Sequence, residues 1–463
     1  MAALFTYRRT IDRGGPGENH LEVPRLLAIR YERTPMPISA QEELPLVFDS
    51  DQRRITSDQF AGQLERFCEF DTATERIVTS FALPNGGTQD VDTFVNEYWT
   101  AKQRAANRLH EISYRACFKP QLPRFFIERL TDPGDVVHDP FMGRGTTPLE
   151  AALLGRIPFA CDINPLSAVL TKPRLDPPAV DEVARRLPQI NLADHDEFPE
   201  ELLVFYHPET LKEIASIKKY LLQRSAAKAL DRVDEWIRMV AINRLTGHSG
   251  GFFSVYTLPP NQATSVKAQQ RINAKRNQTP PRRPVREIIL KKSRILLSEC
   301  DASVRQTLAR ASVRAKLLTQ PAAAASEIAR NSVDLVVTSP PFLDIVDYAG
   351  DNWLRCWFLG IDAKSVAITK LKNLQDWQDA MTAVFRELHR ILRPGGHIAF
   401  EVGEVRHGTI RLEEAVLPCG VEAGLKPVLV LINDQEFTKT ANCWGVDNGD
   451  KGTNTNRIVV LRK

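Results

Sequence analysis

The sequence contains no apolar run that approaches the ~18 residues needed to span a bilayer. Its first twenty residues carry three arginines but lack the apolar segment of a secretory signal. The seven cysteines are scattered and never spaced as Cys-x-x-Cys, which argues against a disulfide framework and a zinc site, and no other metal site is expected. We therefore expect a protein of the reducing cytoplasm that has no membrane partner.

Neither sign of charge is in large excess, because 61 Lys and Arg residues stand against 57 Asp and Glu residues. A net charge of +4 neither indicates nor excludes a nucleic-acid partner, so the distribution of charge along the chain has to decide. The 463 residues suffice for two or three domains of roughly 150 residues each, and 43% hydrophobic residues are typical of globular proteins.

The first part of the chain changes character near residue 90. Residues 1–90 mix prolines with short apolar runs and predict an irregular extension with one helix near 57–70, whose role the sequence does not indicate. Residues 91–175 begin with a helical pattern over 91–110 and continue through a strand, a glycine loop, a helix and a second strand. This β-loop-α-β unit indicates the start of a doubly wound sheet.

Residues 176–312 break the alternation with helical patterns over 208–223 and 227–242, and residues 313–463 resume it. A helix over 377–392 stops at a Pro-Gly-Gly sequence. The simplest interpretation is one α/β domain, Rossmann-like, that is interrupted by an inserted module. Its expected strands are seven: 136–138, 157–164, 315–319, 333–337, 397–403, 427–433 and 456–462.

A glycine loop follows the strand over 136–138. Asp162 ends the next strand 19 positions after Gly143, close to the ~20-residue spacing at which an acid meets a ribose hydroxyl pair. A Walker loop needs Lys after Gly145, and a dinucleotide loop needs Gly where Pro148 stands. A cofactor with a ribose but no phosphate, such as S-adenosylmethionine, is favoured over a tight turn without a ligand. The loop residues are Asp139, Phe141, Gly143, Gly145, Thr146 and Thr147.

A second motif, Ser339-Pro340-Pro341-Phe342, ends the strand over 333–337. Two prolines stiffen the turn and leave carbonyl groups free as acceptors. The Ser339 hydroxyl adds an acceptor, and Phe342 offers a flat apolar face. This set suits an aromatic amine, although a rigid surface turn is the alternative for the motif alone.

Together these segments resemble the amino-methyltransferases of DNA modification. FKPQLPRFFIERLTDPGDVVHDPFMGRGTTPLEAALLGRIPFACDINP is similar to the cofactor region of that family, and VDLVVTSPPFLDIVDYAGDNWLRCWFLG to its catalytic motif. The likeness covers about residues 110–175 and 330–463. It implies a Rossmann-like methyltransferase with a mixed seven-stranded sheet, S-adenosylmethionine as cofactor and duplex DNA as partner. It also allows for a cognate restriction endonuclease in the same system.

Within that family, Ser at the first motif position is associated with N4-cytosine and Asp or Asn with N6-adenine. The resemblance implies that Ser339 and the Pro340 carbonyl hold the amine, Phe342 stacks on the base and Pro341 shapes the turn. The target base has to be flipped out of the duplex. Family members often carry an Asp after the third strand, where this chain has Gln320.

The resemblance also implies a division of the cofactor contacts. One group would contact the methionine end, and Asp162 would contact the ribose. Ile163 and Asn164 would border the adenine. The residues of the first group are Lys119, Pro120, Asp139 and Thr146.

The insert carries ten basic residues between Lys267 and Arg294, against one acid, Glu287. Neutralisation of DNA phosphates is one use of such a stretch, and a solvated basic face is the alternative. We expect DNA contacts from Lys267, Arg271, Lys275, Arg276, Arg282 and Arg283.

Three other functions remain open at this point. An N6-adenine methyltransferase is the nearest alternative. An RNA amine methyltransferase and a DNA-binding protein without catalysis are the others. The sequence indicates no oligomeric state.

Overall fold

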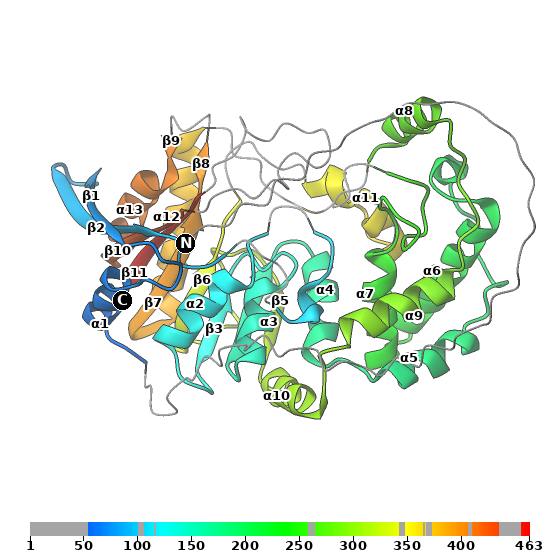
Figure 1. Ribbon diagram of the computed structural model, residues 1–463, viewed down its shortest axis with the longest axis horizontal. Helices are drawn as coiled ribbons and strands as arrows, with labels where there is room; N and C mark the ends of the chain where they lie inside the picture. Colours follow the sequence, from blue (N-terminus) through cyan, green and yellow to red (C-terminus); the bar gives the residue numbers. More distant parts are fainter. Residues whose placement is uncertain are drawn as a thin grey trace, which may run out of the picture. The chain divides into compact units, whose positions relative to one another are not determined.

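The computed structural model describes residues 54–100, 106–114, 117–257, 264–341, 348–363, 366, 373–405, 410–434 and 455–463. Within these ranges lies a mixed nine-stranded sheet of order β1-β2-β10-β11-β7-β6-β3-β4-β5 (Figure 1). No helix in the described ranges is both long and apolar enough to cross a membrane. The strand bounds are β1 (Glu75–Ala82), β2 (Thr88–Asn96), β3 (Val136–Asp139), β4 (Ile157–Asp162), β5 (Lys316–Thr319), β6 (Val333–Thr338), β7 (Leu392–Val402), β10 (Lys426–Asp434) and β11 (Thr455–Arg462).

The topology is that of a Rossmann-like α/β sheet. Strands β5, β4, β3, β6 and β7 are parallel, and β11 runs antiparallel to both β7 and β10. The chain order reverses between β3 and β6, which is where ligands bind in open α/β sheets. The seven strands expected from the sequence are all present, and a separate short hairpin pairs β8 (Glu404–Val405) with β9 (Ile410–Arg411).

The helix predicted over 91–110 is wrong, and the sheet has nine strands rather than seven. Strand β2 runs to Asn96, and only the 3-10 turn η2 (Arg108–His110) is helical in the described part of 91–110. Val91 and Val95 are four residues apart, a spacing that fits both a helix face and one side of a strand. The turn of the β1–β2 hairpin uses Gly86 and Gly87, both at φ +88°.

The hairpin joins the main sheet, because β2 pairs in parallel with β10. Part of the expected N-terminal extension is therefore built into the sheet. The expected helix near 57–70 is confirmed as α1 (Ser57–Glu65), which Thr56 caps by accepting the backbone N–H of Gln59.

Helices cover the two faces of the sheet, and side chains alternate between two cores along each central strand. On β7, Ile398 and Phe400 belong to the core with α12 and α13, whereas Ala399 belongs to the core with α1 and α2. The helices concerned are α2 (Gln121–Leu130), α3 (Thr146–Leu153), α12 (Leu374–Ile391) and α13 (Leu412–Glu422).

The insert is helical and shares a core with the cofactor side of the sheet. Leu149 and Leu170 belong to the same apolar cluster as Phe205 and Trp236 of the insert. The insert and the cofactor side of the sheet are therefore held together by apolar packing. The helices around this apolar cluster, of which α4 and α11 lie outside the insert, are α4 (Leu166–Leu175), α5 (Val180–Arg186), η3 (Leu187–Gln189), η4 (Glu200–Val204), α6 (Pro208–Ala226), α7 (Arg232–Ile242), α8 (Val266–Arg276), α9 (Val285–Leu296), α10 (Ala302–Ser312) and α11 (Tyr348–Leu359).

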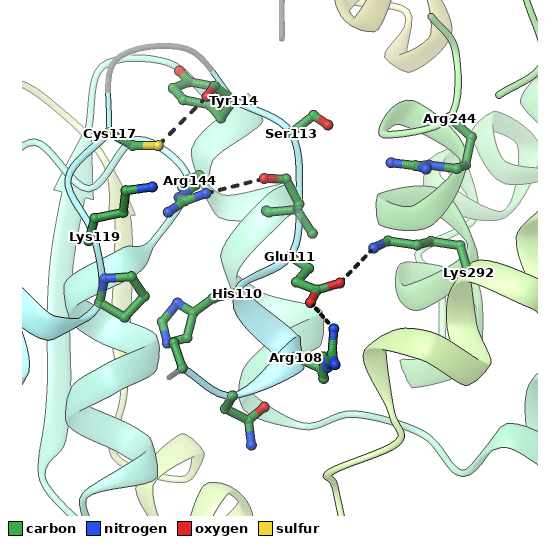
Figure 2. Close-up of a pocket in the computed structure, with 14 residues that line it drawn as sticks. Arg108, His110, Glu111, Ser113, Tyr114, Cys117, Lys119, Arg144, Arg244 and Lys292 are labelled. Carbon is green, nitrogen blue, oxygen red and sulfur yellow. Dashed lines mark hydrogen bonds and ion pairs between the residues drawn. The ribbon is translucent and has the colours of Figure 1, made fainter. Parts of the chain in front are cut away.

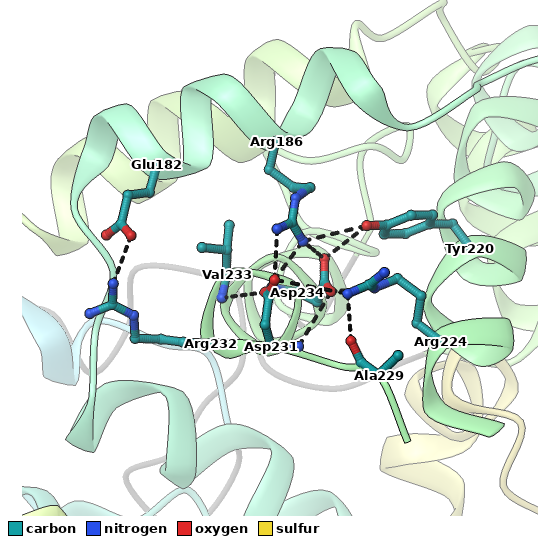
Figure 3. A network of polar contacts seen from close by, with 9 residues as sticks. All are labelled: Glu182, Arg186, Tyr220, Arg224, Ala229, Asp231, Arg232, Val233 and Asp234. Carbon is teal, nitrogen blue, oxygen red and sulfur yellow. Dashed lines mark hydrogen bonds and ion pairs between the residues drawn. The ribbon is translucent and has the colours of Figure 1, made fainter. Parts of the chain in front are cut away.

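A polar network around Asp234 ties three helices of the insert together (Figure 3). The Asp234 side chain is fully buried on α7 and accepts hydrogen bonds from Arg186 of α5, from Arg224 Nε of α6 at 2.5 Å and from the Tyr220 hydroxyl at 3.0 Å. Asp231 caps α7 and accepts a second bond from Arg186 at 2.6 Å. Each carboxylate is thus paired, as burial of charge requires.

Candidate active site

The carboxyl ends of β3, β4, β6 and β7 meet the amino end of β11 at one edge of the sheet. Parallel strands bring their carboxyl ends to the same edge, and antiparallel β11 adds its first residues there. Two of the sequence-predicted groups end at this edge, the glycine loop after β3 and the Ser-Pro-Pro turn after β6. The edge therefore brings together motifs that lie almost 200 residues apart.

The glycine loop is fixed by close contacts. Gly145 has φ +76°, and a Cβ there would lie 2.2 Å from the Thr171 Oγ1 atom, so only glycine fits. Gly143 also has a positive φ, +48°. The Thr147 hydroxyl donates to the Val337 carbonyl at 3.1 Å and so links the loop to β6, while Thr146 is buried.

Asp162 at the end of β4 lies beside the glycine loop. Its carboxylate accepts the backbone N–H groups of Gly143 at 2.9 Å and of Asn164 at 2.8 Å, and burial raises its pKa. Asn164 is buried and its Oδ1 accepts the N–H of Leu166 at 3.0 Å, whereas Ile163 is half-buried. The predicted spacing of 19 residues thus reflects a direct contact between loop and acid.

Gln320 follows β5 next to this acid, and its backbone N–H donates to the Asp162 carbonyl at 3.1 Å. The Nε2 atom of Gln320 is buried and has no hydrogen-bond partner among the described residues. An unpaired buried amide is costly, so an acceptor from a ligand would stabilise it.

The segment before α2, residues 106–114 and 117–120, is called the lead-in and contacts the glycine loop. Arg144 of the loop donates to the carbonyls of Ile112 and Phe118, at 3.3 and 3.4 Å. Pro120 is buried directly before α2, and burial lowers the pKa of the half-buried Lys119. The loop and the lead-in are therefore one assembled unit, as the order of the sequence motifs predicts.

The Ser-Pro-Pro turn is anchored from two sides. Thr338 donates to Asp139 Oδ1 at 2.6 Å, and the indole N–H of Trp377 donates to the Pro341 carbonyl at 3.0 Å. Asp139 also accepts the N–H of Phe141 at 3.0 Å, and burial raises its pKa to about 7. The Pro341 carbonyl is therefore already engaged, while Phe342 lies outside the described residues.

Glu401 is a residue of this edge that the sequence reasoning missed. It lies next to the last residue of β7 and its side chain is buried. The carboxylate accepts a hydrogen bond from Ser339 and another from the Asn456 amide. Burial raises the pKa of Glu401 to about 7. A carboxylate inside the apolar run His-Ile-Ala-Phe-Glu-Val was the available signal, because such residues are rarely buried without a partner.

The predicted DNA-contacting residues lie on the insert. Lys267, Arg271, Lys275 and Arg276 are exposed on α8, and the Arg276 guanidinium lies 3.8 Å from the Tyr256 ring centroid. Two further residues precede α9. Arg282 is exposed and 3.6 Å from Glu213, and Arg283 is half-buried, with its backbone N–H donating to Thr210 at 2.8 Å.

Part of the chain is similar in sequence to known proteins. Residues 40–169 match the family model described as DNA methylase. Over that segment the chain is similar to the DNA amino-methyltransferases. This similarity agrees with the resemblance found in the sequence and with S-adenosylmethionine as the cofactor.

The individual relatives of this chain are distant. The type II methyltransferase M.BsoBI of Geobacillus stearothermophilus is 21% identical over 385 residues, 74% of this chain and 72% of that enzyme. The type II methyltransferase M.MjaII of Methanocaldococcus jannaschii is 36% identical over 62 residues, only 13% of this chain and 12% of that enzyme. The crystal structure of TrmN from Thermus thermophilus has a TM-score of 0.30 and 13% identity; 77% of this chain and 51% of TrmN are covered.

The residues at the edge fit the cofactor of the methyltransferase family. S-adenosylmethionine carries a ribose, an adenine and a methionine end. A carboxylate with further acceptor capacity, Asp162, suits the ribose hydroxyls. The unpaired buried amide of Gln320 suits an adenine ring nitrogen. Nothing in this donor set resembles a phosphate loop, which agrees with a cofactor that has no phosphate.

Proposed function

We propose that this methyltransferase modifies the exocyclic N4 amine of cytosine in duplex DNA. The observation that carries the proposal is the contact between Ser339 and Glu401, next to the bond between Thr338 and Asp139. It supports a turn whose serine is held in place for hydrogen bonding. Ser at this position is associated with N4-cytosine in the family, and Asp or Asn with N6-adenine.

The proposed residue roles follow from the hydrogen bonds. The cofactor supplies an electrophilic methyl group bound to a sulfonium. Because Ser339 donates its only proton to Glu401, the lone pairs of its oxygen are free to accept an N–H from the target amine. The Pro340 carbonyl is the second acceptor of the proposal, and Phe342 the stacking face. Catalysis then rests on positioning of the amine and on electrostatics.

Glu401 has a further role in the proposal. The amine loses one proton when it gains the methyl group. A carboxylate whose pKa lies near 7 is suited to take a proton at neutral pH, and Ser339 connects Glu401 to the amine. The Ser339 hydroxyl would pass its own proton to Glu401 and take the one from the amine.

On the cofactor side, we assign Asp162 to the ribose, with Ile163 and Asn164 bordering the adenine. The methionine end is assigned to the lead-in and the loop, which Arg144 ties together. The residues of that second group are Lys119, Pro120, Asp139, Phe141, Gly143, Gly145, Thr146 and Thr147.

The exposed basic face of α8 supports a contact with DNA phosphates. Lys267, Arg271 and Lys275 have no ion-pair partner among the described residues. Since the relatives from Geobacillus and Methanocaldococcus are type II methyltransferases, the proposal includes a cognate restriction endonuclease as a partner in the same system.

The test is incubation of the full chain with duplex DNA and methyl-labelled S-adenosylmethionine, followed by mass spectrometry of the nucleosides. N4-methylcytosine is the expected product. Ser339→Ala should nearly abolish it while cofactor affinity is kept. The matched control is Ser332→Ala at the other end of β6, whose hydroxyl donates only to the Ala329 carbonyl. N6-methyladenine would keep the enzyme class and overturn the base, and no methylated nucleoside would overturn the proposal.

A further inference from the structure

A cavity of about 640 Å³ lies between the lead-in segment and the helical insert (Figure 2). Lys119 and Arg144 line it from the cofactor side, and Arg244 and Lys292 from the insert. Gly143, Asp162 and Ser339 are not among its lining residues, so the cavity is separate from the strand-end site. It shares the lead-in and Arg144 of the glycine loop with that site.

The residues that line the cavity carry a net positive charge. Five lining residues are Lys or Arg, and Glu111 is the one acid in the lining. Glu111 is already engaged by Arg108 and lies 3.6 Å from Lys292. Arg144 donates only to neutral acceptors, namely Thr146 and two backbone carbonyls. Positive charge in a concave wall attracts an anion.

Arg244 is the residue that points most directly to a ligand. It is 8% exposed, its Nε atom has no hydrogen-bond partner among the described residues, and Figure 2 shows its guanidinium directed into the cavity. The side chain stacks on Phe252, with its guanidinium carbon 4.1 Å from the ring centroid. A buried cation without a partner is costly, and an anion in the cavity would offset that cost.

The neighbouring charges strengthen the same field. Burial, together with Arg355, lowers the pKa of Arg244 to about 10. Burial and the charge of Arg244 lower the pKa of Lys292 to about 8. Burial is the main cause of both pKa shifts, and the repulsion between cations that adds to it would be relieved by an anion bound between them.

We propose that Arg244 and Lys292 bind a phosphodiester group of the DNA backbone. This inference rests on the proposed function, which supplies the polyanion. A guanidinium fork beside an ammonium group suits phosphate oxygens. Both residues belong to the insert, Arg244 just after α7 and Lys292 on α9, whereas Lys119 and Pro120, which are assigned to the cofactor, line the cavity from the side of the sheet. The site would fix the position of the duplex, without reading its sequence.

The test measures the affinity of the full chain for duplex DNA over a series of salt concentrations, and its affinity for S-adenosylmethionine. Arg244→Met keeps the stem on Phe252 but removes the charge, and Lys292→Met does the same on α9. Each should weaken DNA binding about tenfold and reduce the salt slope by about 1, with cofactor affinity unchanged. Lys291→Met, one residue away, exposed and outside the lining, should change both much less.

The outcomes separate this inference from the proposed function. An unchanged DNA affinity and salt slope in both variants would overturn the site, even if N4-methylcytosine is formed. A loss of cofactor affinity instead would assign the cavity to the carboxylate of the cofactor. If the variants lose DNA binding but the wild type forms N6-methyladenine, the site stands and the proposed base is wrong. Arg244→Lys should retain most of the affinity, and thermal melting verifies that each variant folds.

Discussion

The hydroxyl of Thr338 donates a 2.6 Å hydrogen bond to Oδ1 of Asp139. Thr338 directly precedes the Ser-Pro-Pro turn, and Asp139 opens the glycine loop, so one bond joins the two motifs of the methyltransferase. Both side chains are buried, at the ends of neighbouring strands β6 and β3. The chain order of the sheet reverses between these two strands, so the bond fixes the position of the turn relative to the loop at the place where ligands bind in such sheets.

Thr338→Val should therefore destabilise the protein. The change keeps the shape of the side chain but removes the donor, which leaves the buried Asp139 with the N–H of Phe141 at 3.0 Å. We expect a loss of about 1–3 kcal/mol in the free energy of unfolding, measured by urea denaturation. Thr319→Val on the exposed end of β5 is the control and should cost less than about 0.5 kcal/mol. Equal losses in both variants would contradict this role.

Gly145→Ala tests the tight packing of the loop. The new Cβ would lie 2.2 Å from Thr171 Oγ1 and would force a positive φ on alanine, so we expect a loss of about 3 kcal/mol and weak cofactor binding. Gly134→Ala is the control, because Gly134 also has a positive φ, +90°, but no atom within 4 Å of its Cβ position. It should lose only the conformational part, about 1–2 kcal/mol.

A double variant tests the contact between residue 145 and Thr171 by itself. Thr171→Ala in the Gly145→Ala background removes the two closest atoms and should recover part of the stability. Calorimetry of cofactor binding and thermal melting provide both readouts. If Gly145→Ala and Gly134→Ala lose the same stability, the contact with Thr171 has no role.

The parts of the fold that carry local patterns could be predicted from the sequence. The apolar run before Asp139 and the glycines after it define strand, loop and helix within a few residues, and the fixed spacing placed Asp162 at the loop. Resemblance to the amino-methyltransferases added the role that is proposed for the Ser-Pro-Pro turn. These features depend on neighbours in the sequence, which is why they are visible there.

The missed features depend on contacts between distant residues. Glu401 meets Ser339 across 62 positions, and no local pattern specifies that pairing. The sequence predicts a helix at β2 because Val91 and Val95 fit both periods, and the pairing of this segment with β1 and β10 makes it a strand. Arg244 and Lys292 meet at the cavity only after the insert has folded.

Asp234→Ala should destabilise the insert. The substitution leaves Arg186 and Arg224 without the carboxylate that joins α5, α6 and α7, and we expect a loss of about 3 kcal/mol in thermal or urea unfolding. The matched control is Asp181→Ala, since Asp181 forms an exposed pair with Arg185 four residues away on α5. This control should cost about 0.5 kcal/mol or less. A similar effect of both substitutions would show that the network adds no stability.

Glu401→Gln tests the proposed proton path. It should also change how the free energy of unfolding depends on pH. Burial raises the pKa of Glu401 to about 7, so the folded state holds its proton more tightly than the unfolded state. Glu401 contributes its whole stabilising effect below about pH 4.5, where it is protonated in both states, and this effect is lost as the pH rises to about 7. The free energy of unfolding of the wild type should therefore fall across that range. Glutamine does not titrate, so the variant should lose the share of this fall that comes from Glu401, roughly 3 kcal/mol at most, and keep the share that comes from Asp139.

The rate of methyl transfer should respond in the opposite direction. Ionised Glu401 accepts the Ser339 proton, so the wild-type rate should rise with pH around an apparent pKa near 7, whereas Glu401→Gln should remain slow and flat. Asp139 also has a pKa near 7, but it contacts Thr338 and not Ser339, so its titration would persist in the variant as a change in stability. Glu422→Gln, in an exposed pair with Arg386, should keep the wild-type profile. A rising profile that survives Glu401→Gln would exclude Glu401 from the proton path, because the group responsible would then still be present.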